Sequence, residues 1–307
     1  MVRALLILAS LALAGCEDGP DNRVDLLGEN AYAGDISKDG RIIVLAGTDA
    51  GIKVYLDQTE RHSLTKSNNV VAIEDASISP DGRRIATASG NSYAIFSSES
   101  GRRLQEGTVP GLIKSIAVDN RSRLLLGTLQ GAFWLSGDNN LQLSNQPTRA
   151  VALDGRRGII GNDQGQVSVW ALGATRPDYQ FQMDGAVQAV AIDGAQAAAS
   201  AKDVPTRLLS VGSGGKSAEL PQETHYYPTP VFAEAMRITP NGIWIGNSLK
   251  RAAYWDFQAL DEPAQIWRMP TRGGSNPGSA RILGFSKDTK KPAALIATGH
   301  RVELIRD

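Results

Sequence analysis

Few residues in this chain of 307 residues fall into patterns that would support catalysis or metal binding. Its histidines are His62, His225 and His300, and none lies at metal-ligand spacing from another histidine, a cysteine or a pair of carboxylates. We therefore expect surface histidines in loops and no metal site. The spacing alone offers no centre around which a metal-dependent reaction could be organised.

Two further motifs bear on catalysis. Gly214-Gly215-Lys216-Ser217 is similar to the end of a phosphate-binding loop, but Ser210 stands where that motif needs glycine, and strands flank it on both sides. A flexible hairpin turn is the better interpretation. No Gly-x-Ser-x-Gly elbow is present, and the only cysteine, Cys16, has another use. We expect a protein that is not an enzyme.

The first 22 residues indicate export and lipid attachment. Arg3 precedes an apolar run, Ala4 to Leu13, that is too short to span a bilayer as a mature helix. The run ends in Leu13-Ala14-Gly15-Cys16, which resembles the lipobox of bacterial lipoproteins. The resemblance implies a signal peptide at 1–15, cleavage before Cys16, and diacylglycerol and an N-acyl chain such as palmitate on Cys16. No other cofactor is expected. An ordinary secretory signal with an incidental cysteine is the alternative.

An exported chain with one cysteine forms no internal disulfide, and lipidation accounts for that thiol. Residues 16–22 would tether the remaining chain to a membrane of the bacterial envelope, outer or inner, with the periplasmic side expected. Basic and acidic residues number 32 each, so no overall field favours nucleic acid, and none is expected as a partner.

The elements that would position these residues repeat along the chain. Short turn dipeptides recur 35 to 48 residues apart: Asp39-Gly40, Asp81-Gly82, Asp119-Asn120, Asp154-Gly155, Asp193-Gly194, Asn241-Gly242 and Lys287-Asp288. A small, aliphatic run precedes each turn and two further β-rich runs follow it. A period near 40 with four short strands per unit is typical of a β-propeller blade. Residues 23–307 are therefore predicted to form an all-β, seven-bladed propeller of four-stranded antiparallel blades.

The third strands carry a family resemblance. Val167-Ser168-Val169-Trp170 and Ala253-Tyr254-Trp255-Asp256 are similar to the strand endings of WD-repeat propellers, as is Ser-Pro-Asp-Gly at 79–82 to bacterial WD-like repeats. Such propellers commonly close with their N-terminal strand, which pairs an open edge. We expect residues 23–28 to pair with residues 301–306 and so complete the seventh blade.

Two long connections depart from the repeat, Gly212 to Phe232 and Met269 to Ala280. By strand order they share one surface, and tyrosine, tryptophan and arginine dominate protein interfaces. The candidate partner-binding residues are His225, Tyr226, Tyr227, Arg251, Trp267 and Arg272. Packing of the aromatic rings between blades is the alternative. The function expected is a membrane-anchored scaffold for another envelope protein.

Two alternatives remain from other classes. Asp49, Asp163 and Asp203 fall at equivalent loops between second and third strands, so a ring of carboxylates on the axis is conceivable. Such a ring would suit a propeller hydrolase of the lactonase type or a sensor of small ligands or glycans. Turn capping is the commoner use of aspartate at such positions.

Overall fold

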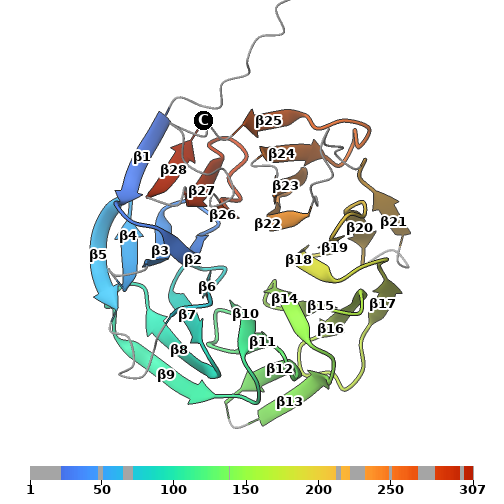
Figure 1. Ribbon diagram of the computed structural model, residues 1–307, viewed down its shortest axis with the longest axis horizontal. Helices are drawn as coiled ribbons and strands as arrows, with labels where there is room; N and C mark the ends of the chain where they lie inside the picture. The colour runs from blue at the N-terminus through green and yellow to red at the C-terminus, as the bar shows by residue number, and fades with distance from the viewer. Residues whose placement is uncertain are drawn as a thin grey trace, which may run out of the picture.

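The computed structural model describes residues 22–47, 51–64, 72–137, 139–211, 216–221, 232–248, 251–268, 281–297 and 301–306. These residues form seven four-stranded antiparallel sheets arranged radially around a central opening (Figure 1). The prediction of an all-β, seven-bladed propeller is confirmed. Within the described part of the chain, no helix has the length and apolar character needed to cross a membrane.

Each blade takes its strands in chain order from the centre outward. Blade one contains β2 (Ala31–Ile36), β3 (Ile42–Gly47), β4 (Ile52–Leu56) and β5 (Thr59–Leu64). Blade two contains β6 (Asp75–Ile78), β7 (Arg84–Ser89), β8 (Ser92–Ser97) and β9 (Arg103–Thr108). Blade three contains β10 (Ile113–Val118), β11 (Leu124–Thr128), β12 (Gly131–Ser136) and β13 (Asn139–Ser144).

The remaining blades follow the same order. Blade four contains β14 (Thr148–Leu153), β15 (Arg157–Asn162), β16 (Gln166–Ala171) and β17 (Tyr179–Gln182). Blade five contains β18 (Val187–Asp193), β19 (Gln196–Ala201), β20 (Arg207–Ser210) and β21 (Lys216–Glu219). Blade six contains β22 (Ala233–Ile238), β23 (Gly242–Asn247), β24 (Arg251–Asp256) and β25 (Gln265–Arg268). Blade seven contains β26 (Arg281–Phe285), β27 (Ala293–Ala297), β28 (Val302–Arg306) and, outermost, β1 (Asn22–Leu27).

Closure by the N-terminal strand is confirmed, but the strand begins at Asn22, the last residue of the expected tether, and ends at Leu27. β1 pairs antiparallel with β28, with Arg23 opposite Ile305 and Leu27 opposite Val302. The hydroxyl of Tyr55 in blade one also donates to the Leu26 carbonyl at 2.8 Å, which joins the closing strand to the first blade. The first strand of the chain therefore seals the ring between its last and first blades.

The hydrophobic core lies between blades and not within them. Seven clusters of buried side chains each draw on two neighbouring blades, including the pair formed by blades seven and one. Near the axis the blades approach so closely that small residues are required. A Cβ added at Gly246 would lie 2.6 Å from Ile282 of the next blade. Each blade is stable only because its neighbours cover its faces.

One predicted boundary is wrong. The stretch Gly212 to Phe232 is not a single connection, because β21 lies within it and forms the outer edge of blade five. The strand is four residues long and polar, as protected edge strands often are, so its sequence has little of the usual β signature. Leu220, directly after it, is 2% exposed and fixes the strand against the core of blades five and six.

Strand direction divides the propeller into two faces. First strands end, and second strands begin, at the turns such as 37–41 and 79–83; we call this side the turn face. The links from each outer strand to the next inner strand, and the loops between second and third strands, lie on the opposite side, the link face. β1 begins at the turn face, because Asn22 pairs with Arg306 at the end of β28.

Candidate functional site: the axial channel and its two mouths

A cavity of about 220 Å³ follows the propeller axis. It is lined by the first strands of all seven blades, β2, β6, β10, β14, β18, β22 and β26. The position follows from the fold, because innermost strands have no neighbour on their axial side. Backbone N–H groups on that side therefore point into the channel and need acceptors from elsewhere.

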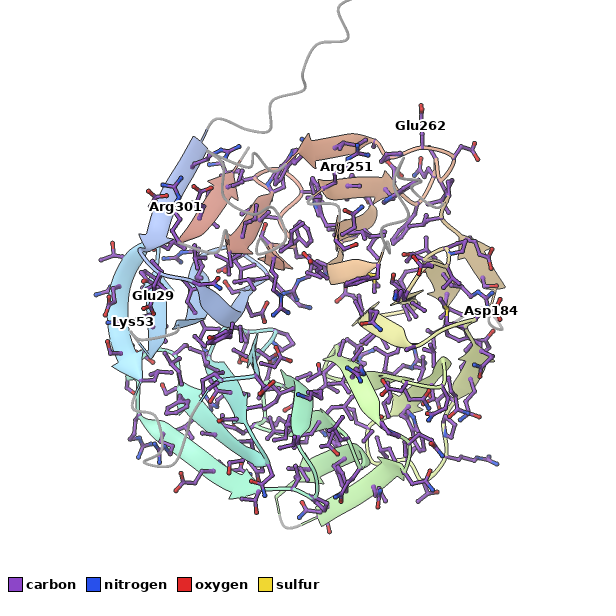
Figure 2. The ribbon with its side chains drawn as sticks, in the orientation of Figure 1. Glu29, Lys53, Asp184, Arg251, Glu262 and Arg301 are labelled. Carbon is purple, nitrogen blue, oxygen red and sulfur yellow. The ribbon has the colours of Figure 1, made fainter. Side chains whose placement is uncertain are left out.

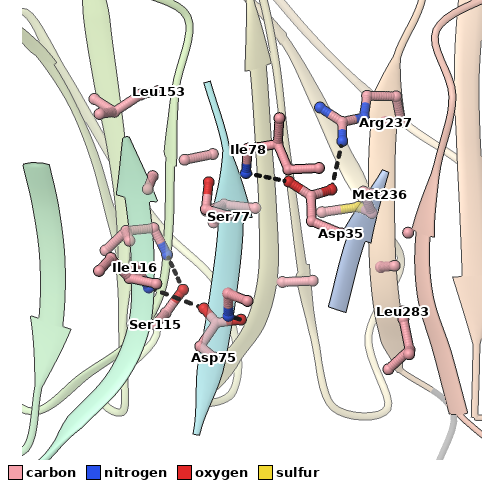
Figure 3. Close-up of a pocket in the computed structure, with 18 of the residues that line it drawn as sticks. Asp35, Asp75, Ser77, Ile78, Ser115, Ile116, Leu153, Met236, Arg237 and Leu283 are labelled. Atoms are coloured by element: carbon pink, nitrogen blue, oxygen red, sulfur yellow. Dashed lines mark hydrogen bonds and ion pairs between the residues drawn. The ribbon is translucent and has the colours of Figure 1, made fainter. Parts of the chain in front are cut away.

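Side chains from the preceding blade supply these acceptors. Asp35 accepts from the N–H of Ile78 at 2.8 Å, and Asp75 accepts from the N–H of Ile116 at 2.9 Å (Figure 3). The Ser115 hydroxyl accepts from the N–H of Val151 at 3.3 Å. Between blades six and seven, Glu234 accepts from the N–H of Ile282 at 3.0 Å. The polar lining of the channel thus ties innermost strands to their neighbours.

Arg237 connects three blades on one side of the channel. From β22 its guanidinium donates to the Asp35 carboxylate of blade one at 2.9 Å (Figure 3). It also donates to the Phe285 carbonyl of blade seven at 2.9 Å. Burial raises the pKa of Asp35 above its ordinary value, although the nearby Arg237 opposes the rise. The pair compensates two charges that the interior would otherwise exclude.

Asp75 has a different environment. Desolvation among the inner strands raises the pKa of its carboxyl to about 6, against the hydrogen bonds from Ile116, Ala76 and Ser115. The negative charge of Asp35 adds to the rise, whereas no cation is among the causes of the shift. Asp75 is therefore a channel carboxyl that titrates well above the ordinary range without a cation to hold it ionised.

The mouth on the turn face is crossed by an ion cluster. Asp193 of blade five accepts from Lys38 of blade one at 3.1 Å and also binds the ammonium of Lys287 of blade seven. Desolvation pushes the pKa of Asp193 upward, but the two lysines outweigh it and hold the pKa below its ordinary value. A carboxylate reaching across the opening to two blades restricts passage at this end.

The mouth on the link face is bordered by one side chain from each blade at the same register of the first strand: Tyr32, Glu74, Lys114, Arg149, Gln188, Glu234 and Arg281. Glu74 pairs with Lys114 at 3.3 Å across blades two and three. Tyr32 is 48% exposed. Leu112 and Leu129, 48% and 37% exposed, lie on the same face and are joined through their backbones, since the Leu129 N–H donates to the Leu112 carbonyl at 3.0 Å.

The axial ring of carboxylates considered from the sequence, Asp49, Asp163 and Asp203, is not supported, because neither described member lines the channel. Asp163 pairs with Arg149 at 2.5 Å on the link face, and Asp203 lies in the loop after β19; neither lines the cavity. Loops between second and third strands are one strand removed from the axis, which explains the difference. Asp49 lies outside the described residues. Among the residues described, no group of three or more histidine, cysteine or acidic side chains is arranged to hold a metal ion.

The predicted partner residues separate into three groups. His225, Tyr226, Tyr227 and Arg272 lie outside the described residues. Arg251 begins β24 at the link face, where its N–H donates to Asn247 at 3.3 Å, and it lies in the outer half of blade six (Figure 2). Trp267 is 3% exposed and packs 4.6 Å from the ring of Trp244 between blades six and seven. For Trp267 the alternative, packing between blades, holds, and the ring is not available to a partner.

The remaining sequence motifs fall in ordinary surroundings. The ring of His62 hydrogen-bonds the Glu99 carbonyl at 2.7 Å, which links the outer parts of blades one and two. Lys216 and Ser217 belong to β21, so the phosphate-loop resemblance has a strand where a helix is required. His300 lies outside the described residues.

We did not predict from the sequence which side chains accept the backbone N–H groups of the channel, or which ones border the mouth on the link face. The register of these side chains comes from the strand pairs and not from the turns. Pairing with the second strands places Asp75 and Ser115 at one position and Glu74, Lys114 and Arg149 at the position before it. Asp75 precedes its turn dipeptide by six residues but Ser115 by four, so aligning the turns of the sequence does not bring them together. A polar side chain at the innermost strand of a repeated unit must face the axis or a neighbouring blade.

Comparison with known proteins supports the fold and does not assign a function. No protein-family profile matches the chain, and no curated protein matches it. Among solved structures it is similar to the β-propeller domain of Cps50 (Swd1) from Myceliophteria thermophila, with a TM-score of 0.71. The likeness covers 92% of this chain and 99% of that one at 9% sequence identity. At this identity the similarity shows a WD-repeat-like, seven-bladed propeller fold.

Proposed function

We propose that the protein is a lipid-anchored scaffold of the bacterial envelope that binds another protein through its link face. The observation that carries the proposal is the opposite placement of two features. β1 begins at the turn face, so a tether at residues 16–21 would leave from that side. The exposed apolar side chains Tyr32, Leu112 and Leu129 lie on the other side. An anchored propeller would present that face away from the membrane.

The link face has the composition of a binding surface. Leu112 and Leu129 form an adjacent exposed pair, and Tyr32 lies at the channel mouth among the charged residues of the border. Apolar and aromatic groups surrounded by polar ones are the usual arrangement of a protein interface. A rigid ring suits such a role because little conformational entropy is lost on binding.

Catalysis is not proposed, because the channel groups already have structural partners. Asp35, Asp75 and Glu234 each accept a backbone N–H of the next blade, and Arg237 is bound to Asp35 and two carbonyls. Withdrawing any of them for acid–base work would leave a channel N–H or a charge uncompensated.

Cross-linking and pull-down from membranes test the scaffold. We expect a specific partner to be captured by the unaltered protein and lost with the double variant Leu112→Asp, Leu129→Asp. Leu104→Asp is the matched control, because Leu104 is also 37% exposed but belongs to the outer strand β9. Capture that survives the double variant, or that is lost equally in the control, would count against a link-face interface.

Lipid attachment is tested separately. The mature protein should have the mass of a chain that begins at Cys16 with its acyl groups, and Cys16→Ser should leave it unprocessed or released from the membrane. Unaltered membrane retention of Cys16→Ser would rule out the anchor.

A further inference from the structure

The turns of the turn face share a charge pattern. In five blades an aspartate accepts the backbone N–H of the residue two positions later, at 2.7–3.1 Å, and that residue is basic. The five basic residues, which we call the basic ring, are Arg41, Arg83, Arg121, Arg156 and Lys290. All five are exposed. The aspartates are turned toward their own backbone, whereas the cationic side chains extend from the face.

Three other arginines follow these turns, Arg84, Arg123 and Arg157, and their side chains contact the next blade. Arg84 donates to Ser122 of the next blade at 3.1 Å, Arg123 to the Gly155 carbonyl at 3.4 Å, and Arg157 to the Gly194 carbonyl at 3.5 Å. These side chains run along the ring and join successive turns. The two kinds of basic residue are therefore distinct, and only the basic ring projects outward.

Ion pairing leaves most of the basic ring available. Arg41 forms a two-point contact with Asp57, at 2.9 and 2.7 Å, so part of its charge is compensated. Arg83, Arg121 and Arg156 belong to three consecutive blades, and no ion pair within the described residues involves them. They form a basic arc, and the loops between third and fourth strands on the same face carry the exposed acidic residues Glu99, Asp178, Asp261 and Glu262. Blades five and six, which have Ala195 and Ile243 at this register, interrupt the ring.

The same face holds the start of the closing strand. Asn22 lies opposite Arg306, and the Arg306 guanidinium donates to the Gly40 carbonyl in the first turn of the face at 2.9 Å. Six residue steps separate Cys16 from Asn22, and a flexible chain of six steps would have a root-mean-square span of about 13 Å. A six-residue strand is about 20 Å long, so an anchor at Cys16 would hold the turn face nearer the membrane than the link face.

We propose that the turn face rests on anionic phospholipid headgroups of the membrane that carries the anchor, with the basic ring as its contact. The inference rests on the proposed lipid anchor. Charge complementarity and the position of the tether both point to this occupant. Each basic side chain near an anionic surface strengthens binding about five-fold, and tethering raises the local concentration of the face at that surface.

Vesicle co-sedimentation tests the contact without the lipid. The protein is the chain from residue 16 onward with Cys16→Ser, which keeps all of the strands. We expect it to bind vesicles of phosphatidylcholine mixed with phosphatidylglycerol, and not phosphatidylcholine alone. Binding should be strong at about 0.1 M salt and lost at about 1 M, because the Debye length falls from about 10 to about 3 Å.

Two variants that each lose three positive charges distinguish an effect of the turn face from an effect of net charge. The triple variant Arg83→Gln, Arg121→Gln, Arg156→Gln should bind about 100-fold more weakly, from three five-fold losses. The control, Lys114→Gln, Arg149→Gln, Arg281→Gln, removes the same charge from the link face and should bind like the parent. Equal loss in both variants, or no preference for phosphatidylglycerol, would overturn the proposal. Loss of the anchor itself is read from the mass of the mature protein, so the two failures are distinguishable.

Discussion

At the scale of single residues, aspartate performs three different tasks in this propeller. Asp81 and its equivalents cap turns, Asp35 and Asp75 cap the axial edges of inner strands, and Asp193 bridges two lysines across the channel mouth. The surroundings decide which pKa results. Two lysines lower the pKa of Asp193, whereas desolvation without a cation raises that of Asp75.

Asp75 should make stability depend on pH. A carboxyl with a higher pKa in the folded than in the unfolded protein binds its proton more tightly when folded, so stability falls as pH rises between the two values. For Asp75 the window runs from 3.8 to about 6. Compared with Asp75→Ser, which places there the side chain of Ser115, the unaltered protein should lose about 3 kcal/mol of unfolding free energy across that window. Urea unfolding at several pH values measures the difference, and parallel curves for the two proteins would contradict it.

Arg237 should contribute more to the free energy of unfolding than an arginine in an exposed ion pair. Arg237→Met leaves the desolvated Asp35 without its cation, and breaking such a pair costs about 3–5 kcal/mol. Arg207→Met is the control, because its pair with Glu219 lies at the outer edge and is worth less than about 1 kcal/mol. Denaturant unfolding measures both. Similar losses of unfolding free energy in the two variants would show that the axial pair contributes no more to stability than the outer pair.

At the scale of elements, the turns made the architecture predictable. An Asp-Gly or Asn-Gly pair specifies a tight hairpin by backbone geometry alone, so the first and second strands of most blades were located from sequence. Outer strands carry a weaker signal. β17 and β21 are each four residues long, because an edge strand needs a partner on one side and little burial. Which aromatic rings are buried was equally undecided, because Trp267 packs against Trp244, a residue of another strand.

The closing strand should carry much of the stability of the ring. Removing residues 22–27 exposes the edge of β28 and takes Leu27 from the core shared by blades seven and one. We expect the melting temperature to fall by about 10 °C, which corresponds to a few kcal/mol for a domain of this size.

Removing residues 16–21 is the matched control for that deletion. The control segment has the same length but precedes the strand, so thermal unfolding should be unchanged. A melting temperature that falls equally in both deletions, or in neither, would contradict closure by β1 as a stabilising element.

At the scale of the whole molecule, the two faces differ because every strand alternates direction around a closed ring. Turns gather on one side with the basic ring and the start of β1, and the exposed apolar groups Tyr32, Leu112 and Leu129 gather on the other. A ring that is held by inter-blade cores moves as one body. If the proposed anchor and the basic ring hold its turn face at a membrane, the entire link face is oriented away from that surface.

That orientation can be measured by labelling, because Cys16 is the only cysteine and the proposed anchor consumes its thiol. Thr289→Cys places an exposed thiol on the turn face beside Lys290, and Gln130→Cys places one on the link face, in the loop between β11 and β12. In anchored protein on anionic vesicles, a maleimide carrying a bulky polymer should react more slowly at position 289 than in detergent. Position 130 should react at the same rate in both, because it points away from the surface. Slower reaction at position 130 alone would mean that the propeller lies on its link face, and the partner would then have to bind elsewhere.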